Sequence, residues 1–216
     1  MDISWLGHSC FRIRGRDVAV VTDPYERGLG YPALKLTADI VTISHDHPNH
    51  ANRAAVQSAS GRLRALVGPG EYEVGGALVE GVQTYRDKVK GKEHGKNTAF
   101  LVHIEDVSVC HLGDLGHSLD AAQIDALKDA DILLIPVGGA CTIDAAEAVE
   151  IVSQLEPKVV IPMHYGMPSL NLESVERFCK EMAATDAATL PRYSVTKTTL
   201  PDETRVVLLA PPETRR

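Results

Sequence analysis

The stretch SHDHPNH, residues 44–50, places three histidines and an aspartate within seven positions. It follows DIVTIS (39–44), a run rich in β-branched residues that is typical of a buried strand. It precedes ANRAAVQSAS (51–60), whose composition predicts a helix. The histidines therefore lie where a strand passes into a helix.

This spacing favours a metal site. His45 and His47 are two residues apart, so their side chains leave an extended segment on the same side. His50 falls in the first turn of the expected helix and can fold back toward the same point. Neutral imidazole nitrogens bind zinc, manganese, nickel and related divalent ions. We therefore expect a divalent metal here, with zinc the first candidate and manganese or nickel as alternatives.

Two further features follow predicted strands, CHLGDLGH (110–117) and PMHYG (162–166). Asp114 lies in a Gly-Asp turn and offers an anionic oxygen that can bridge two ions. His164 ends the buried run KVVIPMHYG (158–166). Side chains at the carboxyl ends of strands in an α/β protein gather at one site.

The rest of the chain predicts hairpins first and βαβ units later, which indicates an α/β (α+β) class of sheets covered by helices. We interpret residues 1–216 as one domain. Strands are expected at 3–7, 10–14, 18–22, 63–68, 77–85, 98–104, 107–113, 131–139 and 204–210. Helices are expected at 118–130, with Ser118 as the N-cap, at 142–155 and at 172–184.

The composition narrows the class of partner. The formal net charge is −7 over 216 residues, which disfavours a nucleic-acid binder. No run approaches a membrane span or a signal peptide, so we expect a cytoplasmic protein with no membrane partner. Four widely spaced cysteines fit free thiols in a reducing compartment, and Cys141 is the one to test for reactivity. A small, anionic substrate is compatible with this charge, and the oligomeric state, including a homo-oligomer, stays open.

Four motifs occur in a recognisable order: WLGHSCF (5–11), SHDHPNH, HLGDLGH (111–117) and IPMHYG (161–166). Together they resemble the metallo-β-lactamase superfamily, in the branch of small metal-dependent hydrolases related to ascorbate-phosphate lactonases. The resemblance implies a four-layer αββα sandwich. It also implies one or two ions that activate water to attack a small ester, lactone, amide or phosphoester. The positions that match metal ligands are His45, His47, His50, Asp114 and His164.

Two positions depart from the family pattern. Asn49 stands where the family has an aspartate that helps to hold the second ion, and Arg86, in TYRD, stands where the family has a histidine. Together the changes shift the charge of the site by about +2, the charge of one divalent ion. We therefore predict a reduced site that binds one ion weakly, or none, in which Arg86 fills part of the space of the missing ion. With one ion bound, Arg86 could stabilise an oxyanion or bind a phosphate or carboxylate. Asp114, Asn49 and Arg86 are the predicted catalytic positions.

Alternatives stay open at this point. The same two changes fit a non-catalytic ligand-binding member of the fold. His94 could swing in as the missing histidine and Asp46 could supply the missing carboxylate, while Asn49 could simply cap a helix. Residues predicted to contact the substrate or to support the ligands are His8, Asp23, His94, Lys96, Asn97 and His117.

Overall fold

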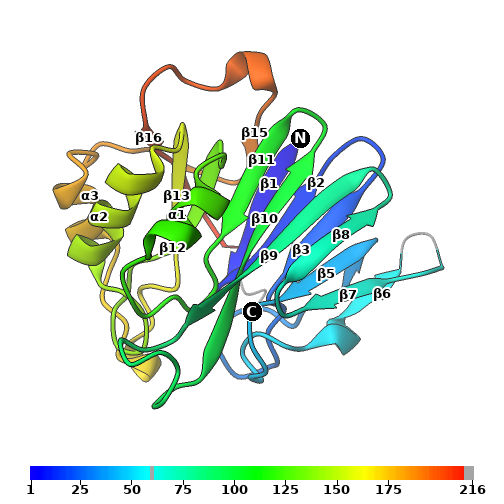
Figure 1. The fold of residues 1–216 in the computed structure, drawn as a ribbon, viewed down its shortest axis with the longest axis horizontal. Coiled ribbons are helices and arrows are strands. Elements are labelled where there is room, and N and C mark those ends of the chain that lie inside the picture. The colour runs from blue at the N-terminus through cyan, green and yellow to red at the C-terminus, as the bar shows by residue number, and fades with distance from the viewer. Residues whose placement is uncertain (59–60, 212–216) are drawn as a thin grey trace.

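The computed structural model describes residues 1–58 and 61–211, which fold into two large β-sheets packed face to face (Figure 1). The first sheet has the strand order β15-β1-β2-β3-β5-β7 and the second the order β16-β13-β12-β11-β10-β9-β8. The first contains β1 (Asp2–Gly7), β2 (Cys10–Arg14), β3 (Ala19–Thr22), β5 (Ile40–Ile43), β7 (Arg64–Val67) and β15 (Tyr193–Ser194). The second contains β8 (Gly70–Val74), β9 (Ala77–Tyr85), β10 (Lys96–Ile104), β11 (Val107–His111), β12 (Ile132–Pro136), β13 (Val159–Met163) and β16 (Arg205–Val206).

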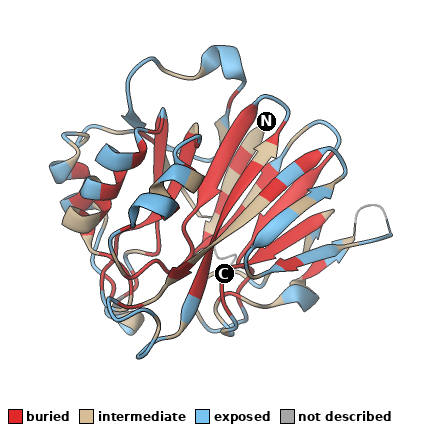
Figure 2. Ribbon diagram, in the orientation of Figure 1, coloured by how far each residue is buried: buried red, intermediate tan, exposed pale blue. Residues whose placement is uncertain are grey.

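The main core lies between these sheets. Strand β1 alternates buried and half-buried residues, so that Ile3 and Trp5 point inward. Every residue of β12 and β13 is buried, because these strands are covered on both faces. Figure 2 shows this difference, with the strands of the interior largely buried and the outer helices partly exposed.

Three helices cover the outer face of the second sheet: α1 (Ala121–Leu127), α2 (Ala145–Leu155) and α3 (Glu176–Glu181) (Figure 1). They confirm the three helices expected after residue 118, although each is shorter than its predicted range. The prediction of Ser118 as an N-cap is wrong, because the Asp120 side chain accepts the Gln123 N–H at 2.9 Å and completes a capping box.

The outer face of the first sheet is covered differently. Loop residues such as Tyr25 pack on it, together with the short pair of β4 (Leu36–Ala38) and β6 (Val56–Ser58). The helix predicted over 51–60 is wrong: the chain forms a 3-10 turn, η1 (Arg53–Ala55), and then β6, while residues 59–60 lie outside the described part. Pairing with β4 and the bond from Asn52 N–H to the Pro24 carbonyl, 2.8 Å, override the helical composition.

The family fold, an α/β sandwich, is confirmed, with one outer layer built from loop and short strands in place of α-helices. The remaining elements are η2 (Pro168–Leu170), η3 (Lys197–Thr199), β14 (Thr189–Leu190) and β17 (Leu208–Leu209). No helix in the described ranges is long and apolar enough to cross a membrane.

Parallel pairing creates the functional edge. Strands β11, β12 and β13 run parallel in one sheet, and β3, β5 and β7 run parallel in the other. The carboxyl ends of β5, β11 and β13 carry the three sequence motifs that hold the predicted metal ligands.

Candidate metal centre

Asp114 lies at the middle of the site, three residues after β11, and is 1% exposed. The preceding Gly113 has φ +58, and a Cβ there would lie 2.5 Å from Asn97 Oδ1, so only glycine fits this turn. Asn97 Oδ1 accepts the Asp114 N–H at 3.0 Å, and its amide group donates to Thr84 Oγ1 and the Leu112 carbonyl. The carboxylate is thus held in place by the chain around it.

Three imidazoles surround this carboxylate. His164 Nε2 lies 3.3 Å from Asp114 Oδ1, while His50 Nε2 and His45 Nε2 lie 3.4 and 3.6 Å from Oδ2. Two ligands at about 2.0–2.1 Å from a tetrahedral ion lie about 3.3–3.4 Å apart. The spacing of these nitrogen and oxygen atoms is therefore close to that of ligands sharing one ion.

Asp23 fixes the protons of two of these rings. Its Oδ2 lies 3.0 Å from His50 Nδ1, so a neutral His50 carries its proton there and leaves Nε2 as a lone pair. Ser44 Oγ donates to the same carboxylate and lies 3.0 Å from His45 Nδ1, which must then be the donor to Ser44. Both rings thus present unprotonated Nε2 atoms to Asp114, as the prediction of a supporting role for Asp23 requires.

This arrangement needs a positive charge. Lone pairs that face a carboxylate repel it, and both His45 Nε2 and Asp114 Oδ1 are buried without a hydrogen-bond partner. Burial alone would raise the pKa of Asp114, but the surrounding histidines, His50 and His164 first, lower it well below its usual range. Burial likewise opposes a charge on His50, but Asp114 and Asp23 outweigh it and raise its pKa. A proton on His50 therefore competes with a metal ion, and the donor set fits a divalent ion.

His47 is placed differently from the other histidines of the cluster. It is half-buried, and its Nδ1 accepts the backbone N–H of Asn49 at 3.2 Å. Its ligand atom still lies within 4.8 Å of those of His45 and His50. Asn49 does not cap a helix, because the described residues after it form a 3-10 turn that begins at Arg53, and then strand β6.

The Arg86 side chain lies beside Asp114. Its Nη2 lies 3.4 Å from Asp114 Oδ2, and its Nη1 donates to the His94 carbonyl at 3.2 Å. The side chain is 18% exposed, and its Nε is buried without a hydrogen-bond partner. The His94 side chain is exposed and belongs to none of the metal-competent groups among the described residues, so the structure does not support its use as a replacement ligand.

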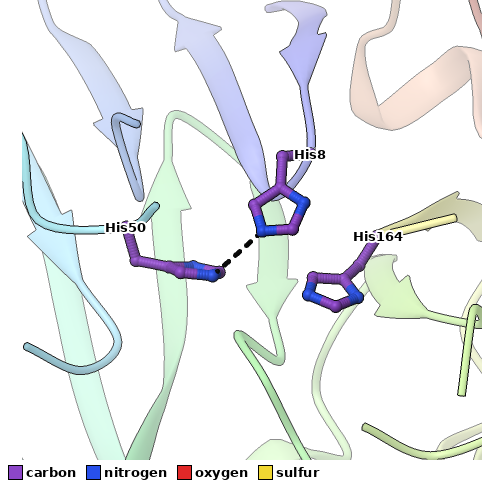
Figure 3. A group of neighbouring side chains, drawn as sticks. All are labelled: His8, His50 and His164. Atoms are coloured by element: carbon purple, nitrogen blue, oxygen red, sulfur yellow. Dashed lines mark hydrogen bonds between the residues drawn. The ribbon is translucent and has the colours of Figure 1, made fainter. Parts of the chain in front are cut away.

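His8 approaches the centre more closely than its sequence suggests. It follows β1, is 1% exposed, and its Nε2 lies 3.2 Å from His50 Nε2. Figure 3 shows His8, His50 and His164 facing one shared space, with all three ligand atoms within 4.8 Å of one another. His8 and His164 also have positive φ values of 52° and 55°, a strained backbone that is common at functional sites.

Of the other predicted residues, some hold the backbone around the site and some lie exposed on the surface. His117 Nε2 accepts the Tyr85 N–H at 3.1 Å and its Nδ1 donates to the Ser118 carbonyl, so it holds the backbone beside Arg86. Asn97 is buried and uses its amide to hold the Asp114 turn, which is the supporting position among its two predicted roles. Lys96 and Asp46 are exposed.

Cys141 was predicted as a thiol to test for reactivity, but its position beside the candidate ligands was not predicted. Its sulfur lies within 4.8 Å of ligand atoms of Asp114 and His164, and it is half-buried, whereas the other three cysteines are buried. The signal in the sequence is its place in the loop after β12, which ends at the same edge as β11 and β13.

Comparison with known proteins decides the family. A profile of the β-lactamase superfamily domain matches residues 2–164. The chain belongs to the metallo-β-lactamase superfamily. A UPF0173 metal-dependent hydrolase from Methanopyrus kandleri is 30% identical over 211 residues, which cover 84% of this chain and 91% of that protein.

Solved structures share the fold of this chain. A Thermotoga maritima protein assigned to the Zn-dependent hydrolases of this superfamily has a TM-score of 0.80 and 36% identity, over 96% of this chain and 97% of its own. An isothiocyanate hydrolase from Delia radicum gut bacteria has a TM-score of 0.69 at 13% identity, over 100% and 99% of the chains, which shows the shared fold alone. The narrower resemblance to ascorbate-phosphate lactonases stays a prediction.

Proposed function

We propose that this superfamily member is a metal-dependent hydrolase with one divalent ion at the Asp114 centre. The observation that carries the proposal is the set of three imidazole Nε2 atoms that lie 3.3–3.6 Å from the buried Asp114 carboxylate, those of His45, His50 and His164. Because His45 Nε2 and Asp114 Oδ1 are buried without a hydrogen-bond partner, this set of groups favours a bound cation. A divalent ion, when bound, lowers the pKa of water and polarises a carbonyl or phosphoryl oxygen.

Arg86 supplies the substrate contact in this proposal. Its Nη1 donates to the His94 carbonyl and its Nη2 contacts Asp114. The side chain is partly exposed, and the guanidinium has further N–H groups that can donate to a substrate. A planar guanidinium forms bidentate hydrogen bonds with carboxylate and phosphate groups. We infer a small substrate with an anionic group next to the scissile bond, such as a lactone, amide or phosphoester.

The centre also limits the choice of ion. Three of the four side chains around Asp114 Oδ1 and Oδ2 are imidazoles and the fourth is the Arg86 guanidinium, and imidazole favours zinc, nickel and iron over magnesium. Zinc is the proposed ion, with manganese and nickel as the alternatives to be compared. A cytoplasmic location is part of the same proposal.

The test is a hydrolysis screen over lactones, phosphodiesters and β-lactams with Zn²⁺, Mn²⁺ or Ni²⁺ added to metal-free protein. We expect activity with at least one class in the wild type, and its loss in Asp114→Asn. His103→Gln is the matched control, because His103 lies on β10 and pairs with Glu80 away from the centre. Flat activity with every ion, together with a retained ligand-induced shift in melting temperature, would instead support the ligand-binding alternative.

A further inference from the structure

The two oxygens of Asp114 have different surroundings. Oδ2 faces the Arg86 guanidinium at 3.4 Å, in addition to His45 and His50. Oδ1 faces His164 Nε2 at 3.3 Å and is buried without a hydrogen-bond partner. The Arg86 guanidinium thus places a fixed positive charge beside Oδ2, whereas the ion pairs of Oδ1 among the described residues include no fixed positive charge.

The His47 ring is also unsuited to an ion on the Oδ2 side. Because the Asn49 N–H donates to His47 Nδ1, a neutral ring carries its own proton on Nε2. An ion bound there would have to displace that proton or break the bond to Asn49. It would also lie near the Arg86 guanidinium, whose like charge repels it.

On the opposite side, the backbone holds His8 in position. The His8 carbonyl accepts the Trp5 indole N–H at 2.9 Å and the His164 backbone N–H at 3.2 Å. This second bond ties the turn after β1 to the end of β13, and it brings the ring centroids of His8 and His164 to 4.3 Å. The preceding Gly7 has φ +112 and lies against the Tyr31 ring, where a Cβ would approach to 2.6 Å, so the turn cannot easily be rebuilt.

The ring nitrogens of His8 are not fully used in hydrogen bonds. Its Nε2 is 3.2 Å from a His50 nitrogen that Asp23 keeps unprotonated, and its Nδ1 is buried without a partner. A histidine kept only for structure normally has its buried nitrogens satisfied. His8 Nε2 can give up its weak contact with His50 once a cation lies between the rings.

We propose that His8 is a metal ligand of this chain, and that the ion lies on the Oδ1 side of Asp114. His50 and His164 complete the ligand set there (Figure 3). His8 replaces the carboxylate of the family aspartate, whose position is occupied by Asn49 in this chain. The Arg86 guanidinium replaces the ion on the Oδ2 side of Asp114. The inference rests on the proposed function, because it places the single ion of that hydrolase.

This arrangement has a consequence for ion choice. A neutral imidazole in place of a carboxylate leaves three histidines and one carboxylate, which favours ions that prefer nitrogen, such as zinc and cobalt, over manganese. It also makes His8 more important for ion binding than His47, although His47 lies within the histidine motif and His8 lies outside it.

The test compares Zn²⁺ and Co²⁺ affinity, by competition with a chromophoric chelator, in the wild type, His8→Gln, His47→Gln and the control His103→Gln. We expect His8→Gln to bind at least about 100-fold more weakly, because even loss of a residue that only supports a ligand costs about 10–100-fold. His47→Gln should lose far less, and His103→Gln should match the wild type. Circular dichroism of each metal-free variant checks the fold.

Diffraction from wild-type crystals grown with Co²⁺ decides the matter if His8→Gln does not fold. An anomalous peak beside His8 and His164 supports the inference, and a peak between His45 and His47 overturns it. Equal losses in His8→Gln and His103→Gln also overturn it. In those cases the protein still binds an ion, so the proposed hydrolase survives; it fails only if the wild type binds no ion and hydrolyses nothing.

Discussion

Replacing Asp23 by asparagine tests the way in which the chain prepares its ligands. Asp23 is fully buried and its Oδ2 receives both the His50 Nδ1 proton and the Ser44 hydroxyl. In Asp23→Asn, an amide NH₂ at this position cannot accept either proton. His50 then gains by moving its own proton to Nε2, where it blocks the lone pair that binds metal.

The expected loss follows from this change. Removing a carboxylate that orients a ligand histidine typically weakens metal binding by about 10–100-fold. Here the carboxylate is fully buried and contacts the ligand His50 directly, so we expect the upper end, about 100-fold or about 2.7 kcal/mol. The variant is otherwise close to isosteric, and the Ser44 N–H can still donate to the remaining oxygen.

Zn²⁺ competition titrations measure the affinity, and ¹⁵N NMR of the metal-free protein reports which His50 nitrogen carries the proton. Asp131→Asn is a matched control, because Asp131 accepts comparable bonds from Ser108 and Lys197 at the amino end of β12, the far end of that strand. An Asp23→Asn protein that binds Zn²⁺ within about threefold of the wild type would refute the reasoning, whatever its stability.

Three further predictions concern the surroundings of the site. Gly113→Ala should lower the free energy of unfolding by about 2–4 kcal/mol in urea titrations, because it forces a Cβ into a positive-φ turn against Asn97; an unchanged midpoint would contradict this. Asp87 accepts four backbone N–H groups of its loop, which outweigh burial and lower its pKa to about 2. The loop should therefore be fully ordered above the unfolded pKa of about 3.9 and loosen as pH falls toward 2, as NMR of its amides would show, with no such transition in Asp87→Asn. In the native protein iodoacetamide should label Cys141 before the three buried cysteines, and added Zn²⁺ should slow that labelling; uniform labelling of all four would argue against it.

Sequence reasoning located the groups at strand ends because such positions are fixed by topology. A buried run followed by a polar ligand, as at His45, Asp114 and His164, places the ligand at the carboxyl edge of a sheet whatever the loops do. The supporting carboxylate Asp23 could be suggested for the same reason, since it directly follows β3, the strand that pairs with β5.

The contact of His8 with His50 could not be predicted, because it joins residues 42 positions apart through the backbone bond between His8 and His164. The proton positions on the rings likewise depend on neighbours such as Ser44 and Asn49 in three dimensions. The helix expected after His50 failed for a related reason: its alanines favour a helix locally, but pairing of Val56 with Leu36 gives the segment a strand.

The most direct test of the account is the number of ions bound per chain, by elemental analysis of purified protein together with anomalous scattering from its crystals. The account predicts one ion in the wild type and a second in the double variant Asn49→Asp/Arg86→His, which restores the missing ligands and removes the guanidinium from Asp114. Two ions at full occupancy in the wild type would contradict it.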